Sequence, residues 1–411
     1  MSGGVDSAVA ALLLREDGRR AQAVFLRMWP GDDPRSCCSP TAESRARDLA
    51  DRLGLPFHVL DLSEEFEALV VQPFVAAYLE GYTPNPCVAC NRFRFARLVE
   101  WADQHGLQWV ASGHYARLLE DDGPWLARGC DPHKDQSYML AAVAPQQLVR
   151  MRLPVGELTK RQVRALAWRA GLPSAEAAES QEVCFAVNGY RAFLQSRGVA
   201  PLPGRIVDEA GVELGRHAGH WHYTVGQRRG LALGGGEALY VLKRCAERNE
   251  VVVGPRARLN TVDVQVDELD DRAVAALQGF DGVNGCPAAA HDREAADRAR
   301  AAASSGRLTV QLRYRSPAVG VASAWRVGAR GARLRLATAF SAAAPGQAAV
   351  FYRGERVVGV GRVALAARCW GPNQGSAERC LRQGGTGSVI PLEARSPEPD
   401  DSLRTHGGQT C

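Results

Sequence analysis

The alternation of apolar runs with helical stretches over the first 115 residues limits the possible folds most. Runs at 24–28, 57–62 and 108–113 have the continuous apolar character of strands that are buried on both faces. Helical periodicity precedes or separates them, at 8–16, 41–54, 64–80 and 92–106. Strands separated by helices of this length favour parallel pairing through right-handed crossovers. We therefore predict an α/β domain with a parallel sheet over residues 1–145.

The remaining chain changes texture twice. Residues 146–203 are rich in helical patterns, and Thr159 with Gln162 predicts a capping box for a helix that Gly171 ends. From residue 204 short runs such as RIVD, YTVG, LYVL and EVVVG alternate with turns, which predicts a small β domain over 204–262. We expect an irregular insertion at 263–306, a second small β-barrel at 307–364, and a disordered tail at 365–411.

Composition narrows the class of protein. The 411 residues are 46% hydrophobic and 23% charged, a balance typical of a soluble globular chain. No apolar run approaches the roughly 18 residues of a membrane span, and the first residues do not resemble a secretory leader. We therefore expect a cytoplasmic location. The net charge of +5 permits a polyanionic partner without requiring one.

Glycine and hydroxyl residues at the start of the chain predict an anion-binding turn. Ser2-Gly3-Gly4-Val5-Asp6-Ser7 leads directly into an apolar helical stretch. Two glycines let the backbone approach a ligand closely, and the N–H groups of the following helix start attract phosphate. No lysine follows, so this is not a Walker A loop. The alternative is an ordinary glycine turn in which Ser7 or Asp6 caps the helix.

Thiols provide the second indication of chemistry. Eleven cysteines are too few for a disulfide scaffold in a chain of this length. Cys87 and Cys90 form a C-x-x-C, which we expect between a proline-rich turn and the helix at 92–106, where a thiol pKa is lowered. Two inert cysteines are the alternative there, and Cys184 by itself is more often a core residue. A lone His114 is more often structural, and capping explains Asp135 as well as ligand binding does.

The ordered set of motifs resembles the tRNA-specific 2-thiouridylases of the PP-loop ATP pyrophosphatase superfamily. The resemblance runs from Met1 to about Arg362 through SGGVDSAVAA, GYTPNPCVACN, SGHYAR, KDQSYML, LPVGELTKRQVR, ESQEVCF, YTVGQRRGL, LRYR and PGQAAVFYRGERVVGVGRV. It implies a PP-loop domain, a helical connector and two small β-barrel modules. It also implies ATP-dependent 2-thiolation of the wobble uridine of tRNA, by adenylation of the C2 oxygen and sulfur transfer from a cysteine persulfide.

The resemblance also implies roles for individual residues. Cys184 would carry the persulfide, and Cys90 would be the second catalytic thiol, paired with Cys184 in a disulfide during turnover or freeing sulfide from it. The nucleotide would be bound by Ser2, Gly3, Gly4, Val5, Asp6, Ser7, Met28 and Gly113. The tRNA would be contacted by Asn85, Pro86, Cys87, His114, Lys134, Asp135, Gln136, Arg313, Tyr314 and Gln347. ATP with Mg²⁺, the anticodon arm of tRNA, and a cysteine desulfurase or sulfur-carrier protein are the implied cofactors and partners.

Three departures from the family pattern affect these expectations. The strand that should precede the Ser2–Ser7 loop is absent from the sequence, so we expect weak ATP binding, improved by an upstream extension of about 8–12 residues. Cys87 stands where many members have Asp, so Cys87, Cys90 and Cys184 are candidate ligands of a [4Fe–4S] cluster. The segment 263–306 has no counterpart. Another PP-loop adenylating tRNA sulfurtransferase, and a truncated non-catalytic tRNA-binding relative, remain as alternatives.

Overall fold

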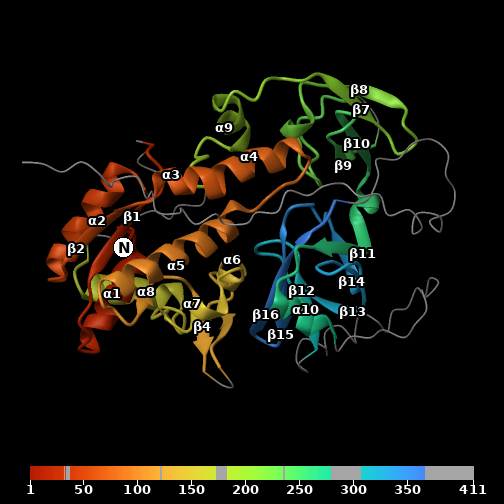
Figure 1. Ribbon diagram of the computed structural model, residues 1–411. Coiled ribbons are helices and arrows are strands. Elements are labelled where there is room, and N and C mark those ends of the chain that lie inside the picture. Colours follow the sequence, from red (N-terminus) through yellow and green to blue (C-terminus); the bar gives the residue numbers. More distant parts are fainter. Residues whose placement is uncertain are drawn as a thin grey trace, which may run out of the picture. The chain divides into compact units, whose positions relative to one another are not determined.

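The computed structural model describes residues 1–31, 33, 38–120, 123–172, 183–234, 237–278 and 307–365 (Figure 1). The expectations for the tail from residue 366 onward, and for most of the 263–306 insertion, lie outside these residues.

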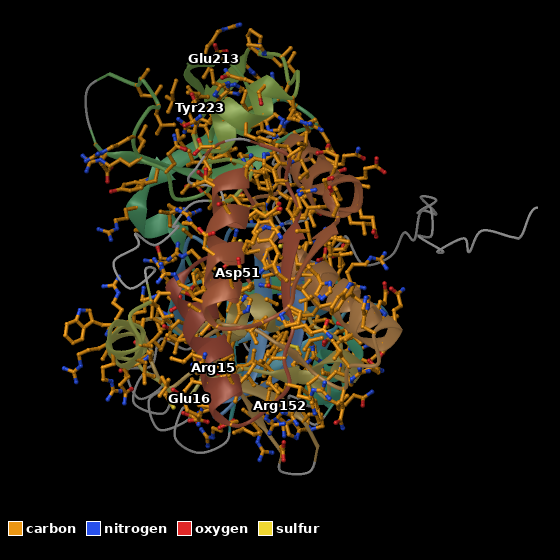
Figure 2. All side chains as sticks on the ribbon, turned by 90° about the vertical axis from the view of Figure 1, so that its left-hand side faces the viewer. Arg15, Glu16, Asp51, Arg152, Glu213 and Tyr223 are labelled. Carbon is orange, nitrogen blue, oxygen red and sulfur yellow. The ribbon has the colours of Figure 1, made fainter. Side chains whose placement is uncertain are left out.

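The N-terminal region is an α/β unit with parallel strand pairs, as predicted. Its first elements are α1 (Val5–Glu16), β1 (Ala23–Arg27), α2 (Pro40–Arg52) and β2 (Phe57–Asp61). β1 pairs in parallel with β2, and β3 (Val110–Ala111) pairs in parallel with β6 (Met151–Arg152). Helix α1 buries its apolar face, whereas Arg15 and Glu16 at its end are exposed (Figure 2). Met1 donates from its α-amino group to the carbonyl of Val24 in β1.

The helix that contains the C-x-x-C begins earlier than predicted. After α3 (Ser63–Phe66), a π-helical turn (Glu67–Val71) and α4 (Gln72–Leu79), helix α5 spans Pro86–Gln104. The predicted start at residue 92 is wrong because Pro86 occupies the first helical position and Asn85 caps it, its Oδ1 accepting from the Cys87 N–H at 3.1 Å. Cys87 and Cys90 therefore lie within the first two turns of α5.

After α5 the chain forms a hairpin and several short helices. β4 (Ala116–Leu119) and β5 (Trp125–Arg128) pair antiparallel and are followed by α6 (Ser137–Leu140), α7 (Pro145–Leu148), α8 (Lys160–Arg169) and α9 (Tyr190–Ser196). The predicted capping box is confirmed: Thr159 and Gln162 exchange hydrogen bonds at 2.8 and 3.3 Å. Gly171 follows α8 with φ +63°, the left-handed conformation that a C-terminal glycine permits.

The central β module is a four-stranded sheet. Its strand order is β8 (Glu213–His217), β7 (Gly204–Val207), β10 (Glu250–Pro255) and β9 (Leu239–Cys245), around a core that includes Ile206, Val241 and Val251. The run YTVG was expected to be a strand and is not one. It follows a short 3₁₀ helix (η3, His220–His222) and turns at Thr224–Gln227, where Gly226 has φ +89°.

The C-terminal barrel is closed. Its six strands are β11 (Asn260–Asp267), β14 (Ala332–Ser341), β13 (Val319–Arg326), β12 (Leu308–Gln311), β15 (Ala348–Arg353) and β16 (Arg356–Val363), and β11 also pairs with β16. A short 3₁₀ helix (η4, Arg256–Leu259) precedes it. Helix α10 (Asp271–Gln278) contradicts the irregular segment expected there: Asp270 accepts from the Ala273 N–H at 2.8 Å, and Ala273 and Leu277 are buried against the barrel.

The barrel sheet continues into the N-terminal region. Arg356 of β16 pairs with Ala127 of β5, so the β4–β5 hairpin extends the sheet of the barrel. Side chains from both regions fill one hydrophobic cluster, among them Leu126, Tyr138, Val350 and Tyr352. The α/β region and the barrel are therefore joined by both backbone pairing and shared core packing.

Candidate nucleotide and thiol site

The glycine-rich loop forms a tight turn at the start of α1. Gly3 has φ +71°, and a Cβ atom there would lie 2.9 Å from the Ala42 carbonyl oxygen. Ser7 Oγ donates to the Gly4 carbonyl at 2.9 Å and lies 3.2 Å from Ser2 Oγ. Gly113 packs so closely that a Cβ atom would be 2.5 Å from the Asp6 backbone. The loop thus has the close backbone approaches that a phosphate cradle needs.

Asp6 in this loop is held by two residues that the sequence analysis did not single out. Lys160 Nζ, at the start of α8, lies 2.7 and 2.9 Å from the two Asp6 carboxylate oxygens. Tyr115 donates its hydroxyl to the same carboxylate at 2.7 Å. Both stand inside motifs quoted for the family resemblance, TKRQ and SGHYAR, but no spacing rule links them to residue 6. The long-range contact is set by the packing of α8 against α1.

The two thiols with implied catalytic roles border the same apolar cluster. Cys90, which is 9% exposed, packs in a core with Met28 and Phe185, and half-buried Cys184 packs against that core. The Cys90 thiol is 4.0 Å from Met28 Sδ. A residue expected beside adenine and both expected catalytic thiols are therefore brought together from the end of β1, from α5 and from the 183–186 turn.

A cation adjoins this cluster, and an imidazole lies within reach of its charge. Arg94 Nη2 lies 3.7 Å from both Cys90 Sγ and Met28 Sδ. His114 Nδ1 is 2.9 Å from Ser112 Oγ, and burial together with the Arg94 charge lowers the pKa of His114 to about 3. His114 is therefore neutral at physiological pH, so it can offer a hydrogen-bond donor and an acceptor but no positive charge.

Cys87, Cys90 and Cys184 do not form a metal centre as they are placed. Within the described residues, no three side chains of Cys, His, Asp or Glu gather in a geometry that could hold a metal ion. All three cysteines are outside disulfide bonds. The arrangement consequently does not match a cluster held by three thiolates.

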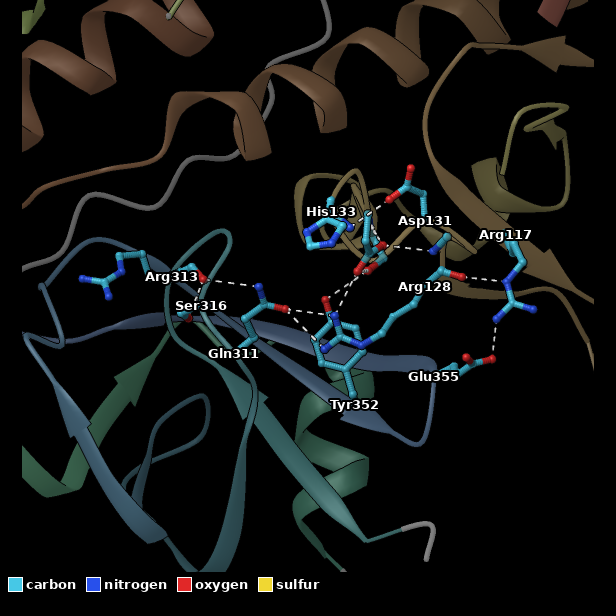
Figure 3. Close-up of polar contacts among 12 residues, drawn as sticks. Arg117, Arg128, Asp131, His133, Gln311, Arg313, Ser316, Tyr352 and Glu355 are labelled. Carbon is cyan, nitrogen blue, oxygen red and sulfur yellow. Dashed lines mark hydrogen bonds and ion pairs between the residues drawn. The ribbon is translucent and has the colours of Figure 1, made fainter. Parts of the chain in front are cut away.

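The KDQS segment is engaged inside the protein (Figure 3). Asp135 accepts from the Arg128 guanidinium at 2.9 Å, from the Gly129 N–H at 3.0 Å and from the Ser137 N–H at 3.0 Å. Gln136 Oε1 accepts from the Tyr115 N–H at 2.9 Å. The capping alternative thus describes the Asp135 contacts well. These side chains order the segment.

The three barrel residues implied in tRNA contact lie in different settings. Exposed Arg313 lines a pocket of about 510 Å³ together with Tyr240 and Arg256. Tyr314 packs against the ring of Tyr138, with centroids 6.0 Å apart. Gln347 donates from Nε2 to the Thr83 carbonyl at 2.6 Å, in the connection that leads to α5.

No helix in the described part of the chain combines the length and the apolar character needed to cross a bilayer. The described residues thus combine a glycine-rich loop and a thiol cluster in an α/β unit with two β modules that follow it in the chain.

Family models divide the chain in the same order. Residues 1–188 match the tRNA methyl transferase HUP domain, residues 191–255 the tRNA methyl transferase PRC-barrel domain, and residues 293–363 the aminomethyltransferase beta-barrel domain. The fold and the site thus define a HUP-type nucleotide-binding protein with a PRC-barrel module and a further β-barrel.

Curated relatives identify the family. The tRNA-specific 2-thiouridylase MnmA of Moorella thermoacetica is 41% identical over 380 residues, covering 90% of this chain and 99% of the relative. The protein of the same name from Thermus thermophilus is 41% identical and covers 87% and 92%, and that from Chloroflexus aurantiacus is 41% identical and covers 89% and 97%. The chain belongs to the tRNA-specific 2-thiouridylase MnmA family. These matches give no support to the two alternative functions considered above.

A solved structure, the NMN synthetase of Francisella tularensis, covers 43% of this chain and 63% of its own at 21% identity and a TM-score of 0.30. That likeness is too weak to support an argument.

Proposed function

We propose that the protein 2-thiolates the wobble uridine of tRNA in an ATP-dependent reaction. The observation that supports this most is near-complete coverage, at 41% identity, of relatives named for that activity. The glycine loop and the thiol cluster, which share one α/β unit, provide the two kinds of group that the reaction needs. A cytoplasmic location suits an enzyme that acts on tRNA.

ATP activates the oxygen that must leave. An adenylyl group on the uridine C2 oxygen turns a poor leaving group into AMP, with pyrophosphate released. We assign the binding of the phosphates, with Mg²⁺, to the loop formed by Ser2, Gly3, Gly4, Val5, Asp6 and Ser7. Met28 would lie beside the adenine, and Gly113 would let the nucleotide approach the backbone closely. The positive φ of Gly3 and the contact of Gly113 with Asp6 support this assignment because both positions exclude a side chain.

The thiols supply the sulfur. A persulfide on Cys184 attacks C2 through its outer sulfur, and AMP departs with the former oxygen. The Cys90 thiolate then attacks Cys184 Sγ, breaking the sulfur–sulfur bond, leaving the outer sulfur on the base and forming a Cys90–Cys184 disulfide that a thiol reductant reopens. In the alternative sequence, Cys90 attacks the persulfide first and frees sulfide. Their shared apolar cluster supports a direct reaction between the two residues.

The partners follow from this chemistry. The anticodon arm of tRNA must present its base extruded, since the C2 edge is otherwise inaccessible. We assign contacts with the tRNA to Asn85, Pro86, Cys87, His114, Lys134, Asp135, Gln136, Arg313, Tyr314 and Gln347. The persulfide sulfur would come from a cysteine desulfurase or a sulfur-carrier protein.

Replacing Cys184 with Ser tests the proposal. We expect the Cys184→Ser protein to lose 2-thiouridine formation while still forming adenylated tRNA, because the hydroxyl cannot carry sulfane sulfur. Mass spectrometry of digested tRNA measures both products. Cys130→Ser is the matched control, since Cys130 is exposed and outside the thiol cluster. Wild-type levels of 2-thiouridine from Cys184→Ser would refute the assignment.

A further inference from the structure

A buried arginine of the central β module contacts the segment that leads into the thiol-bearing helix. Arg244 of β9 is 3% exposed. Its Nη2 donates to the carbonyls of Gly81 and Tyr82 at 2.9 and 2.6 Å and to Thr83 Oγ1 at 2.9 Å. The three acceptors are consecutive residues of the connection between α4 and α5, residues 80–85.

The surroundings of Arg244 are unusual for a charged group. The guanidinium carbon lies 5.5 Å from the centre of the Tyr78 ring, and that ring stacks on Tyr190 at 4.7 Å. Nε and Nη1 are buried and have no hydrogen-bond partner among the described residues. Burial lowers the pKa of Arg244 to about 10, so the group is still charged at neutral pH. A buried cation held mainly by carbonyl oxygens and a ring face is costly to desolvate.

The same connection also contacts the C-terminal barrel. Thr83 donates its N–H to the Pro345 carbonyl at 2.7 Å, and its carbonyl accepts from Gln347. Gly346, with φ +91°, packs so closely that a Cβ atom would lie 2.8 Å from Tyr82 Cβ. Two β modules thus both contact residues 81–83.

The connection in turn sets the start of α5. Two residues beyond Thr83, Asn85 caps the helix through the Cys87 N–H and donates from Nδ2 to Met139 Sδ at 3.6 Å. Cys90 lies one turn further along the helix. A shift of the connection would therefore move the cap and the thiol together.

We propose that Arg244 is a positioning residue for sulfur transfer, which couples the central β module to the start of α5 through the connection at 81–83. This role rests on the proposed function, in which Cys90 reacts with Cys184. The planar guanidinium suits this role because its Nη2 contacts three acceptors while the group lies near the Tyr78 ring. A thiol misplaced by about 1 Å loses on the order of a hundredfold in rate.

Hydrogen exchange tests the coupling without tRNA or ATP. In the full chain with Arg244→Met, we expect amide exchange at residues 81–90 to rise at least about tenfold while exchange in the C-terminal barrel stays unchanged, since this variant keeps the stem and loses the donors. Arg258→Met is the control, because Arg258 is an exposed residue of the same region paired with Glu209. Unchanged exchange at 81–90 would overturn the proposal.

Kinetics test its consequence for sulfur transfer. We expect kcat for thiolation to fall at least about tenfold in Arg244→Met with the KM for ATP unchanged, and Arg244→Lys to recover part of the loss because an ammonium group reaches fewer acceptors. Thr83→Val removes one acceptor at little risk to folding, and it should shift both readouts in the same direction by less. If Thr83→Val raises exchange equally across the whole chain, or if Arg244→Lys is no better than Arg244→Met, the coupling is refuted. If the wild-type chain does not thiolate tRNA but Arg244→Met still raises amide exchange at residues 81–90, the proposed function alone is refuted.

Discussion

At the scale of single residues, the start of the chain depends on a contact made far away in sequence. Lys160 and Tyr115 both bind the Asp6 carboxylate, so the loop expected to bind phosphate is oriented by α8 and by the residue after His114. The Lys160 side chain is 11% exposed and that of Asp6 is 32% exposed. The pair is thus partly desolvated, and loss of one partner leaves an inadequately compensated charge.

Lys160→Met should lower both ATP affinity and stability. We expect a loss of about 2 kcal/mol in unfolding free energy, between the values typical of exposed and of buried pairs. ATP affinity should fall because the loop is no longer held in place. Urea unfolding and calorimetric titration with ATP measure the two effects. Arg161→Met, at the next and exposed position of α8, is the control; equal behaviour of the two variants would contradict the prediction.

At the scale of elements, the junction between the β4–β5 hairpin and the barrel organises the KDQS segment. Arg128 of β5 binds Asp135, contacts Gln311 of β12 at 3.3 Å, and stacks 3.8 Å from the centre of the Tyr352 ring on β15 (Figure 3). One side chain therefore connects three elements, and it comes from β5, the strand of the hairpin that pairs with β16 of the barrel.

Arg128→Met should weaken this junction. We expect a loss of about 2–3 kcal/mol in unfolding free energy, because the Asp135 carboxylate and the Gln311 carboxamide lose a charged donor in a largely buried setting. Chemical denaturation provides the value. Arg326→Met, at the exposed end of β13 in the same barrel, is the control. A difference below about 0.5 kcal/mol between the two would show that the junction does not depend on Arg128.

The position of Arg313 on the barrel leads to a prediction about tRNA binding. Arg313 is exposed at a pocket between the two β modules, so its loss should weaken tRNA binding and leave ATP affinity unchanged. If Arg313 contacts a phosphate, the slope of log affinity against log salt should become shallower by roughly one unit in Arg313→Ala. Filter binding over a salt series measures both quantities, with Arg326→Ala for comparison. Unchanged affinity and slope would exclude a contact at this position.

At the scale of the whole molecule, buried basic groups with lowered pKa values make the stability of the fold sensitive to acid. Burial lowers the pKa of His220 to about 4, with smaller effects from the charges of Arg244 and His217, and it lowers the pKa of the Met1 α-amino group to about 5. His114 has a pKa lowered in the same direction. Each group binds its proton more readily in the unfolded chain. Stability is therefore fully present above the unfolded pKa and is lost as pH falls toward the folded value.

The fold should lose stability between pH 7.5 and 5.5. A histidine with an unfolded pKa of about 6.5 that stays neutral in the native state contributes a loss of about 1.4 kcal/mol at pH 5.5. Urea unfolding at the two pH values measures the total. In His220→Gln the pH-dependent loss should be smaller by about that amount, whereas in His133→Gln, at an exposed position, it should match the wild type. The same loss in both variants would contradict this origin.

Local patterns determined a large part of this protein. The apolar runs at 24–28 and 57–62 became the paired strands β1 and β2, and the Thr159–Gln162 box opened α8, because period and capping depend on neighbours within a few residues. The start of α5 and the turn at 223–226 were predicted wrongly. In both places proline or glycine backbone preferences, together with packing, outweighed the side-chain pattern.

Tertiary structure alone decided which distant residues meet. The sequence motifs, through the family resemblance, pointed to Cys90 and Cys184, but not to the cluster with Met28 and Phe185 in which they lie. Nothing local relates Lys160 to Asp6 or Arg244 to the connection at 81–83, because those contacts depend on how helices and β modules pack across more than a hundred residues of chain. Residue identity supplies the chemical groups, and close packing of the folded chain selects which of them act together.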